Sequence, residues 1–224
     1  MSENNFVYVD AVYRSRMTLL DILEGRGYSV DKYRKFSPAE AAAAVAGGFP
    51  SLGFKVYKKD KEGAEDKNKL CDVRYKNVGR QKQYIEGLFD DIPDEKSEDT
   101  EVVIMMAEPV MDAHHNAALQ QYTRIKESNE NERRKLRVSF FCIYMIVVNP
   151  LHHVLVPKHE IVPVEQHKAL MESLYITSKA KFPEIKFHVD PIARCIGAVP
   201  GDIVKITRAS ASAGEAVIYR VCAP

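Results

Sequence analysis

Two alternating runs near the carboxyl end of the chain constrain its fold more than any other feature. Residues 203–208 alternate between apolar and polar side chains, and residues 216–221 do so again. An alternating run of this length is typical of a half-buried strand. Between the runs lies a small, polar reversal that ends at Gly214. Two such runs around a glycine-containing reversal predict an antiparallel hairpin.

A turn signal precedes the first of these runs. Pro200-Gly201-Asp202 combines a residue of fixed φ with one that accepts positive φ. We therefore expect positive φ at Gly201 and at Gly214. A β-branched residue at either position would cost over about 1 kcal/mol.

The hairpin belongs to a longer series of motifs in the last third of the chain. The series is Val-Pro-Lys-His at 156–159, Asp-Pro-x-Ala-Arg at 190–194, Gly-Asp-Ile-Val-Lys-Ile-x-Arg at 201–208, Ser-x-x-x-Gly at 210–214 and Tyr-Arg at 219–220. It resembles the fifth-largest subunit of eukaryotic-type DNA-directed RNA polymerases, whose carboxy-terminal half corresponds to a small subunit of archaeal RNA polymerase. An amino-terminal phrase, from Arg16 to Tyr28, resembles the start of the eukaryotic version. The chain departs from the family pattern at Cys195, Ala209 and Ala211.

The resemblance implies a function without catalysis in this chain. The chain would be a structural subunit of a multisubunit polymerase in the nucleus, with no catalytic residue and no cofactor or metal of its own. Residues 150–224 would form an α+β assembly domain that anchors the chain to the largest catalytic subunit and contacts other subunits. Residues 1–149 would form an α/β jaw domain beside downstream duplex DNA, which it would contact weakly and without sequence specificity.

The resemblance also implies roles for individual residues. Contact with the partner subunit is expected at His159, Arg194, Lys205, Arg208, Ser210 and Arg220. Structural turns are expected at Pro157, Asp190, Pro191, Gly201 and Gly214. A scattered set of basic residues is also what an ordinary solvated face carries, so the composition alone does not decide between these interpretations.

The expected DNA-proximal segment follows a buried strand in the first half of the chain. Its members are Pro109, His114, His115 and Asn116. Two carboxylates, Glu108 and Asp112, would oppose phosphate there, whereas Arg124, Lys126 and residues 133–135 supply positive charge.

Composition limits the classes of protein to consider. The chain has 224 residues and a formal net charge of +1, so no global attraction to nucleic acid follows. Four scattered cysteines without CxxC spacing indicate buried free thiols in a reducing compartment. The longest apolar run, residues 138–148, is about half the length that spans a bilayer. We therefore expect a soluble intracellular protein that does not enter a membrane.

Periodicity predicts the secondary structure of the first half. Helices are expected at 8–25, 38–46, 78–88 and from Asp112 toward Asn129. Strands are expected at 52–57, 71–75 and 102–107, with a central strand or buried element at 138–148. Exposed or acidic loops are expected at 58–69 and 90–101, and a second-half helix at 163–180.

Three other functions compete with the polymerase interpretation. The first is a free-standing nucleic-acid or protein-binding module that uses the same fold. The second is a nuclease, for which Asp72, Arg74 and Lys76 form the nearest acidic–basic cluster, although this offers one carboxylate where a metal-dependent site needs at least two oxygen ligands. The third is a metal site at His152, His153 and His159, whose spacing lacks a matching cysteine or carboxylate pair.

Overall fold

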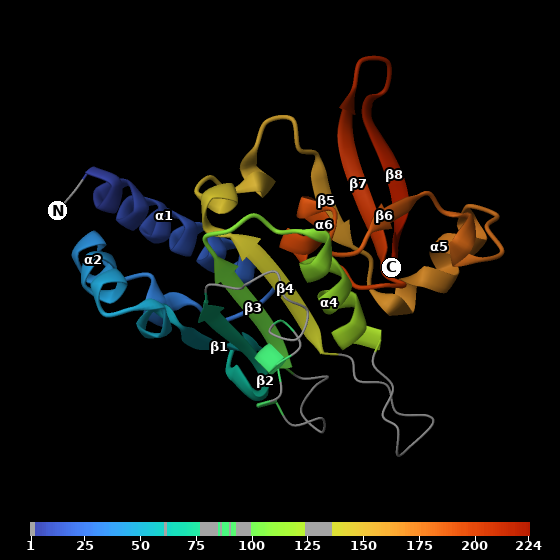
Figure 1. Ribbon diagram of the computed structural model, residues 1–224. Coiled ribbons are helices and arrows are strands. Elements are labelled where there is room, and N and C mark those ends of the chain that lie inside the picture. Colours follow the sequence, from blue (N-terminus) through green and yellow to red (C-terminus); the bar gives the residue numbers. More distant parts are fainter. Residues whose placement is uncertain are drawn as a thin grey trace. The chain divides into compact units, whose positions relative to one another are not determined.

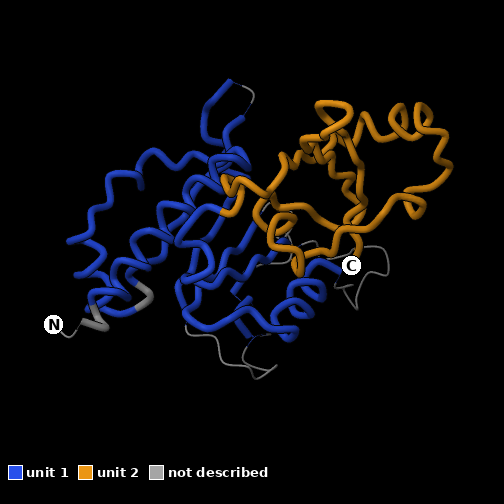
Figure 2. The backbone as a smooth tube through the Cα atoms, turned by 90° about the horizontal axis from the view of Figure 1, so that it is seen from above, with its two compact units in different colours: residues 1–149 blue, residues 150–224 orange. Residues whose placement is uncertain are grey.

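The chain forms two compact units, each built around its own sheet. The computed structural model describes residues 3–60, 62–76, 85, 87–89, 91–92, 100–123 and 136–224. The units are Met1–Asn149 and Pro150–Pro224, coloured separately in Figure 2. Each unit contains a four-stranded mixed sheet, so the architecture is mixed α/β throughout.

The amino-terminal unit holds the elements labelled α1 to β4 in Figure 1. Their bounds are α1 Glu3–Gly25, α2 Pro38–Ala46, β1 Phe54–Lys59, β2 Glu65–Tyr75, β3 Thr100–Met106, α4 Asp112–Thr123 and β4 Arg137–Cys142. Helix α2 begins where the sequence predicts. The side chain of Ser37 accepts from the Glu40 amide, and the Glu40 carboxylate accepts from the Ser37 amide, which completes a capping box.

The first sheet has the order β1-β2-β3-β4. Strand β1 is antiparallel to β2, while β2, β3 and β4 are parallel to one another. Every side chain of β3 is buried, as a parallel strand between two helical layers requires. On one face Phe140 contacts His114 of α4, with ring centroids 5.2 Å apart. On the other face the end of α1 reaches Glu101, through Arg26 and Tyr28.

The structure confirms several predicted elements of this unit and corrects others. Helices 8–25 and 38–46 and strand 102–107 are present. A loop is expected over 58–69, but Lys58 and Lys59 complete β1 and residues 65–69 begin β2, because backbone pairing orders even charged residues on a hairpin; the described residues 60 and 62–64 lie between the two strands. The apolar run 138–148 is split. Strand β4 lies at the sheet edge and ends at Cys142, and a 3₁₀ helix, Ile143–Ile146, follows.

Some expectations fall on residues outside the described ranges. Most of the predicted helix 78–88 and of the acidic loop 90–101 lies there, although Gly87–Phe89 is described as a 3₁₀ turn and β3 begins at Thr100. The helix predicted from Asp112 is described as far as Thr123, and Asp112 is its first residue. Arg124, Lys126 and residues 133–135 also lie outside the description.

The carboxy-terminal unit holds a sheet of order β5-β7-β8-β6. Its elements are β5 Lys158–Ile161, α5 His167–Ser173, β6 Glu184–Lys186, α6 Pro191–Ile196, β7 Ile203–Ser210 and β8 Gly214–Ala223. The predicted hairpin is confirmed as β7 and β8, which pair antiparallel from Ile203↔Val221 to Ser210↔Gly214. One face of this sheet packs Ile203 and Val221 against Phe182 and residues around α5.

Turn residues define the ends of these elements. Oδ1 of Asp190 accepts the amides of Ile192 and Ala193 at 2.8 and 2.9 Å, and thereby caps α6. Pro191 occupies the first helical turn, and Gly197 ends α6 with φ of 74°. Positive φ is confirmed at Gly201 (93°) and Gly214 (71°).

The single helix predicted over 163–180 is wrong. The segment consists of a 3₁₀ turn at Val164–Gln166, helix α5, and a second 3₁₀ turn at Lys179–Lys181. The left-handed conformation of Tyr175, with φ of 55°, takes the chain out of the helix. Downstream, the Ser178 side chain accepts the Ala180 amide and begins a new turn.

Candidate partner-binding site

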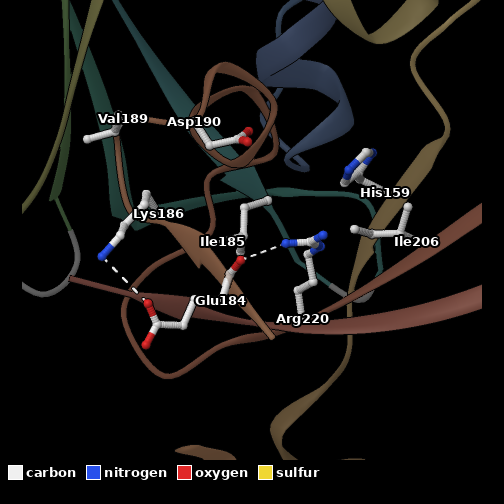
Figure 3. Close-up of a pocket in the computed structure, with 8 residues that line it drawn as sticks. All are labelled: His159, Glu184, Ile185, Lys186, Val189, Asp190, Ile206 and Arg220. Carbon is white, nitrogen blue, oxygen red and sulfur yellow. Dashed lines mark hydrogen bonds and ion pairs between the residues drawn. The ribbon is translucent and has the colours of Figure 1, made fainter. Parts of the chain in front are cut away.

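A pocket opens on the face of the carboxy-terminal sheet opposite α5. Its volume is about 420 Å³, and Figure 3 shows the residues that line it. They come from all four strands and from the segment before α6: His159, Glu184, Ile185, Lys186, Val189, Asp190, Ile206 and Arg220. Alternation along the strands explains the separation of the faces. Ile206 points away from Ile203, whose face packs against α5.

The floor of the pocket is apolar and its rim is polar. Ile185 of β6 and Ile206 of β7 are both buried, with 6 and 7% of their surfaces exposed. The rim includes exposed Arg220 of β8 and half-buried His159 of β5. The pocket therefore suits a ligand that has a polar group next to an apolar one.

Arg220 and its neighbours form a small network of polar contacts. Nη1 of Arg220 donates to the backbone carbonyl of Glu184 at 2.8 Å, as the dashed line in Figure 3 shows. The carboxylate of Glu184 pairs instead with Nζ of Lys186 at 3.5 Å. Asp190 directs Oδ1 at the first amides of α6. The two carboxylates of the rim are thus engaged by groups other than Arg220.

The hydrogen bond of His159 defines its tautomer. Nδ1 lies 2.7 Å from the carbonyl oxygen of Pro157. A carbonyl oxygen only accepts, so Nδ1 carries the hydrogen and Nε2 is the second hydrogen-bonding atom of the ring. The carbonyl of Pro157, which directly precedes β5, therefore orients the imidazole.

The other residues expected at a partner contact lie in different places. Arg208 and Ser210 share the pocket face of β7 but lie toward the hairpin tip, where Ser210 Oγ accepts the Ala213 amide at 3.3 Å. Lys205 lies on the opposite face of β7, because it is one residue from Ile206. Arg194 lies within α6 and is half-buried. The structure thus brings His159, Asp190 and Arg220 together in one pocket and places the rest outside it.

Sequence reasoning missed the part of the pocket that β6 supplies. This strand has three residues and pairs parallel to β8 at Val221 to Ala223. A run so short has no usable periodicity. The one available signal was Ile185 between two charged residues, Glu184 and Lys186, which is the alternation of a strand.

The residues expected near DNA differ widely in exposure. Pro109 and Asn116 are exposed and His115 is half-buried. His114 is instead buried, with 1% of its surface exposed, and its Nδ1 accepts the Met111 amide at 2.9 Å. Burial lowers the pKa of His114. Its ring belongs to the packing of α4 on β4, so a phosphate contact would fall to its neighbours.

A buried charge cluster lies in the amino-terminal unit. The carboxylate of Glu101 accepts from Arg26 and from the Tyr28 hydroxyl, and Arg137 lies 3.8 Å away. Burial alone would raise the pKa of Glu101, but Arg26 and Arg137 outweigh it and leave that pKa lowered. Burial and the neighbouring Glu101 charge raise the pKa of Tyr28, which keeps its hydroxyl as a donor.

The acidic–basic cluster considered for a nuclease forms ion pairs. Arg74 binds Asp72 at 2.8 Å and Asp91 at 2.9 Å. Within the described ranges, no three histidine, cysteine or acidic side chains are grouped as metal ligands. All four cysteines are described and buried, and none of them forms a disulfide. No described helix combines the length and apolar character needed to cross a bilayer.

Comparison with known proteins identifies the class to which the carboxy-terminal unit is related. A family model described as "RNA polymerase Rpb5, C-terminal domain" matches residues 148–222. Subunit Rpo5 of the DNA-directed RNA polymerase of Archaeoglobus fulgidus is 55% identical over 69 residues, which are 31% of this chain and 88% of that subunit. Rpo5 of Methanosarcina barkeri is 52% identical over 71 residues, 32% of this chain and 88% of the relative. Rpo5 of Sulfurisphaera tokodaii is 45% identical over 75 residues, which are 34% of this chain and 87% of that subunit.

The relatives are subunits of DNA-directed RNA polymerases, and this defines the class of protein. The matched residues coincide with the unit that carries the pocket. The chain belongs to the Rpb5/Rpo5 family of RNA polymerase subunits. The resemblance stated from the sequence motifs is thereby confirmed.

Proposed function

We propose that this chain is a non-catalytic structural subunit of a nuclear DNA-directed RNA polymerase. Residues 150–224 attach it to the largest catalytic subunit, and residues 1–149 form a jaw beside downstream DNA. The observation that carries the proposal is the Rpb5-type match, which lies on one compact unit and extends over nearly all of each archaeal relative.

The geometry of the carboxy-terminal unit supports attachment rather than chemistry. Its pocket has an apolar floor and a polar rim in which Glu184 and Asp190 are already engaged. Arginine at the rim suits a polar protein interface, because its planar guanidinium offers several donors at once. Catalysis, with its metal ions, is assigned to the partner chains.

The jaw assignment rests on the part of the chain that the archaeal relatives do not match. That part folds as a separate unit and includes the phrase from Arg16 to Tyr28 that resembles the eukaryotic version. Arg16 is structural there, since Nη1 donates to the Leu52 carbonyl at 2.6 Å. Exposed Pro109 and Asn116 are the expected points of approach to DNA.

Affinity purification of the full chain tests the attachment. A tagged copy expressed in its own cells should recover the two large catalytic subunits in near-equal amounts, measured by quantitative mass spectrometry. Gly201→Val serves as a matched variant, because it strains a turn in the attachment unit and leaves the tag unchanged. The same fusion should locate to the nucleus. Recovery of the wild-type chain without polymerase subunits would leave the free-standing binding module as the better interpretation.

Photo-crosslinking tests the jaw. A crosslinking residue at position 116, in an elongating complex, should reach downstream duplex DNA, and its yield should not depend on DNA sequence. The matched control is position 165, since Glu165 is also exposed but lies in the carboxy-terminal unit. Crosslinks from position 116 to protein alone would contradict the placement of the jaw and leave the attachment proposal intact.

A further inference from the structure

We propose that the pocket on the carboxy-terminal sheet binds a short acidic segment of the largest polymerase subunit. In this segment an aspartate or glutamate meets Arg220, and an adjacent apolar side chain lies on Ile185 and Ile206. The inference rests on the proposed function, because it names the feature of the partner that the attachment unit recognises.

The first reason is the charge of Arg220. One of its five N–H donors is used by the Glu184 carbonyl, at 2.8 Å, and a carbonyl carries no formal charge. Glu184 itself pairs with Lys186, and Oδ1 of Asp190 accepts two amides of α6. A carboxylate from outside complements the guanidinium, with which it forms paired, charge-assisted hydrogen bonds.

The second reason is the apolar floor. Ile185 and Ile206 are almost fully buried, yet both line the pocket. Val189, at the rim, is 53% exposed. Val189 therefore holds most of the hydrocarbon surface that an apolar side chain of the bound segment can remove from water, and this removal favours binding. A free anion would use the arginine and leave this surface uncovered, so a peptide segment is the better occupant.

The third reason is the position of His159. It lies on β5, whereas Arg220 lies on β8, and Ile206 of β7 lies between them in the sheet. Because Nδ1 of His159 is held by Pro157, its Nε2 is left to accept a backbone N–H of the bound segment. A segment that crosses the strands therefore meets an arginine, an apolar floor and a histidine in turn.

Carbodiimide coupling in the intact polymerase tests the occupant directly. The reagent joins a lysine amine to a carboxylate in contact with it, with no spacer. Nζ of Lys186 is directed at Glu184, 3.5 Å away, so the coupling amine is supplied by the Arg220→Lys variant, which should couple at position 220 to an aspartate or glutamate of the largest subunit, identified by mass spectrometry. Exposed Lys168, on α5 and hence on the other side of the sheet, is the control and should give no such product.

Substitutions measure the contribution of each group in the full chain. Arg220→Gln should weaken binding to the largest subunit about tenfold to a hundredfold, as expected for loss of hydrogen bonds to a charged group. Arg220→Lys should retain part of the affinity, because it keeps the charge and loses the planar donor pair. His159→Phe should weaken binding less than Arg220→Gln, and Lys168→Gln should leave it unchanged. Thermal unfolding of each variant separates weakened binding from a damaged fold.

The outcomes distinguish a failure of the pocket assignment from a failure of the proposed function. If the wild-type chain assembles, Arg220→Gln assembles equally well and the amine at position 220 of Arg220→Lys gives no product with the partner, the pocket assignment is overturned while the proposed function stands. Coupling of the amine at position 220 of Arg220→Lys to the partner sustains the assignment even if Arg220→Gln fails to fold. A chain that never associates with the catalytic subunits overturns both.

Discussion

The hydroxyl of Tyr28 lies 2.9 Å from Oε2 of Glu101, although the two residues are 73 positions apart in the chain. Arg26 binds the other oxygen of the same carboxylate. Glu101 and Arg26 side chains are each only 3% exposed, so this pair is shielded from water. The end of α1 is therefore joined to the sheet by a buried charge as well as by apolar packing.

Replacement of that carboxylate should destabilise the protein strongly. Glu101→Gln removes the negative charge that faces Arg26, and breaking a buried ion pair costs about 3–5 kcal/mol. The control is Glu24→Gln, because Glu24 pairs with Arg34 at the surface. Exposed pairs contribute less than about 1 kcal/mol. Denaturant unfolding measures the free energy of unfolding of both variants. Equal losses would contradict the claim that the Glu101 pair is buried and the Glu24 pair is exposed.

The same carboxylate makes stability depend on pH. The pKa of Glu101 is lower in the folded chain than in the unfolded one, so its contribution is complete above the unfolded pKa. It is lost as pH falls through the folded pKa. The stability difference between wild type and Glu101→Gln should therefore be constant near neutral pH and shrink in acid. If the stability difference grew on acidification, the pKa of Glu101 would have to be raised in the folded chain, contrary to the prediction.

Positive φ at Gly201 should make alanine unfavourable there. Neither Gly201 nor Gly25 has a neighbour within 4 Å of an added Cβ, but Gly201 has φ of 93° whereas Gly25 is the last residue of a right-handed helix. Gly201→Ala should cost about 1 kcal/mol. Gly25→Ala should be neutral or stabilising by up to about 1 kcal/mol. The difference between the melting temperatures of the two variants measures the cost of placing a Cβ at positive φ. Equal melting temperatures would refute this cost.

The cap of α6 should be measurable in the same way. Asp190→Ala removes the acceptor of two backbone amides and should cost about 0.5–2 kcal/mol. Asp190→Asn keeps a side-chain oxygen at the cap and should cost less. If both variants unfold at the wild-type temperature, the hydrogen bonds of this cap do not contribute to stability.

The carboxy-terminal unit should fold by itself. Residues 150–224 contain a complete sheet and a packed cluster around Ile203 and Phe182. A fragment of these residues should give dispersed amide resonances, unfold cooperatively and capture the largest subunit. The matched control is the same fragment with Gly201→Val. Collapsed resonances in native buffer would show that the unit depends on residues 1–149.

Local patterns in the sequence predicted the elements that have their own periodicity. The β7–β8 hairpin follows from alternation around Gly214, and α2 follows from Ser37 and Glu40. The pocket was harder to foresee, because it joins residues of four strands through long-range pairing that periodicity does not reveal. The sequence pattern predicts Glu101 as the end of an acidic loop, since isolated carboxylates are usually exposed. Its partner, Arg26, lies 75 residues earlier.

The order of strands in the second sheet has a consequence for synthesis of the chain. Strand β8 lies between β7 and β6, yet it is the last of the four to leave the ribosome. Strand β7 gains its central neighbour only when residues 214–221 have been made, and β6 only when Val221–Ala223 has been made. Domains generally fold as units, with the amino-terminal one first. The attachment unit thus becomes competent for assembly only after the rest of the chain has had time to fold.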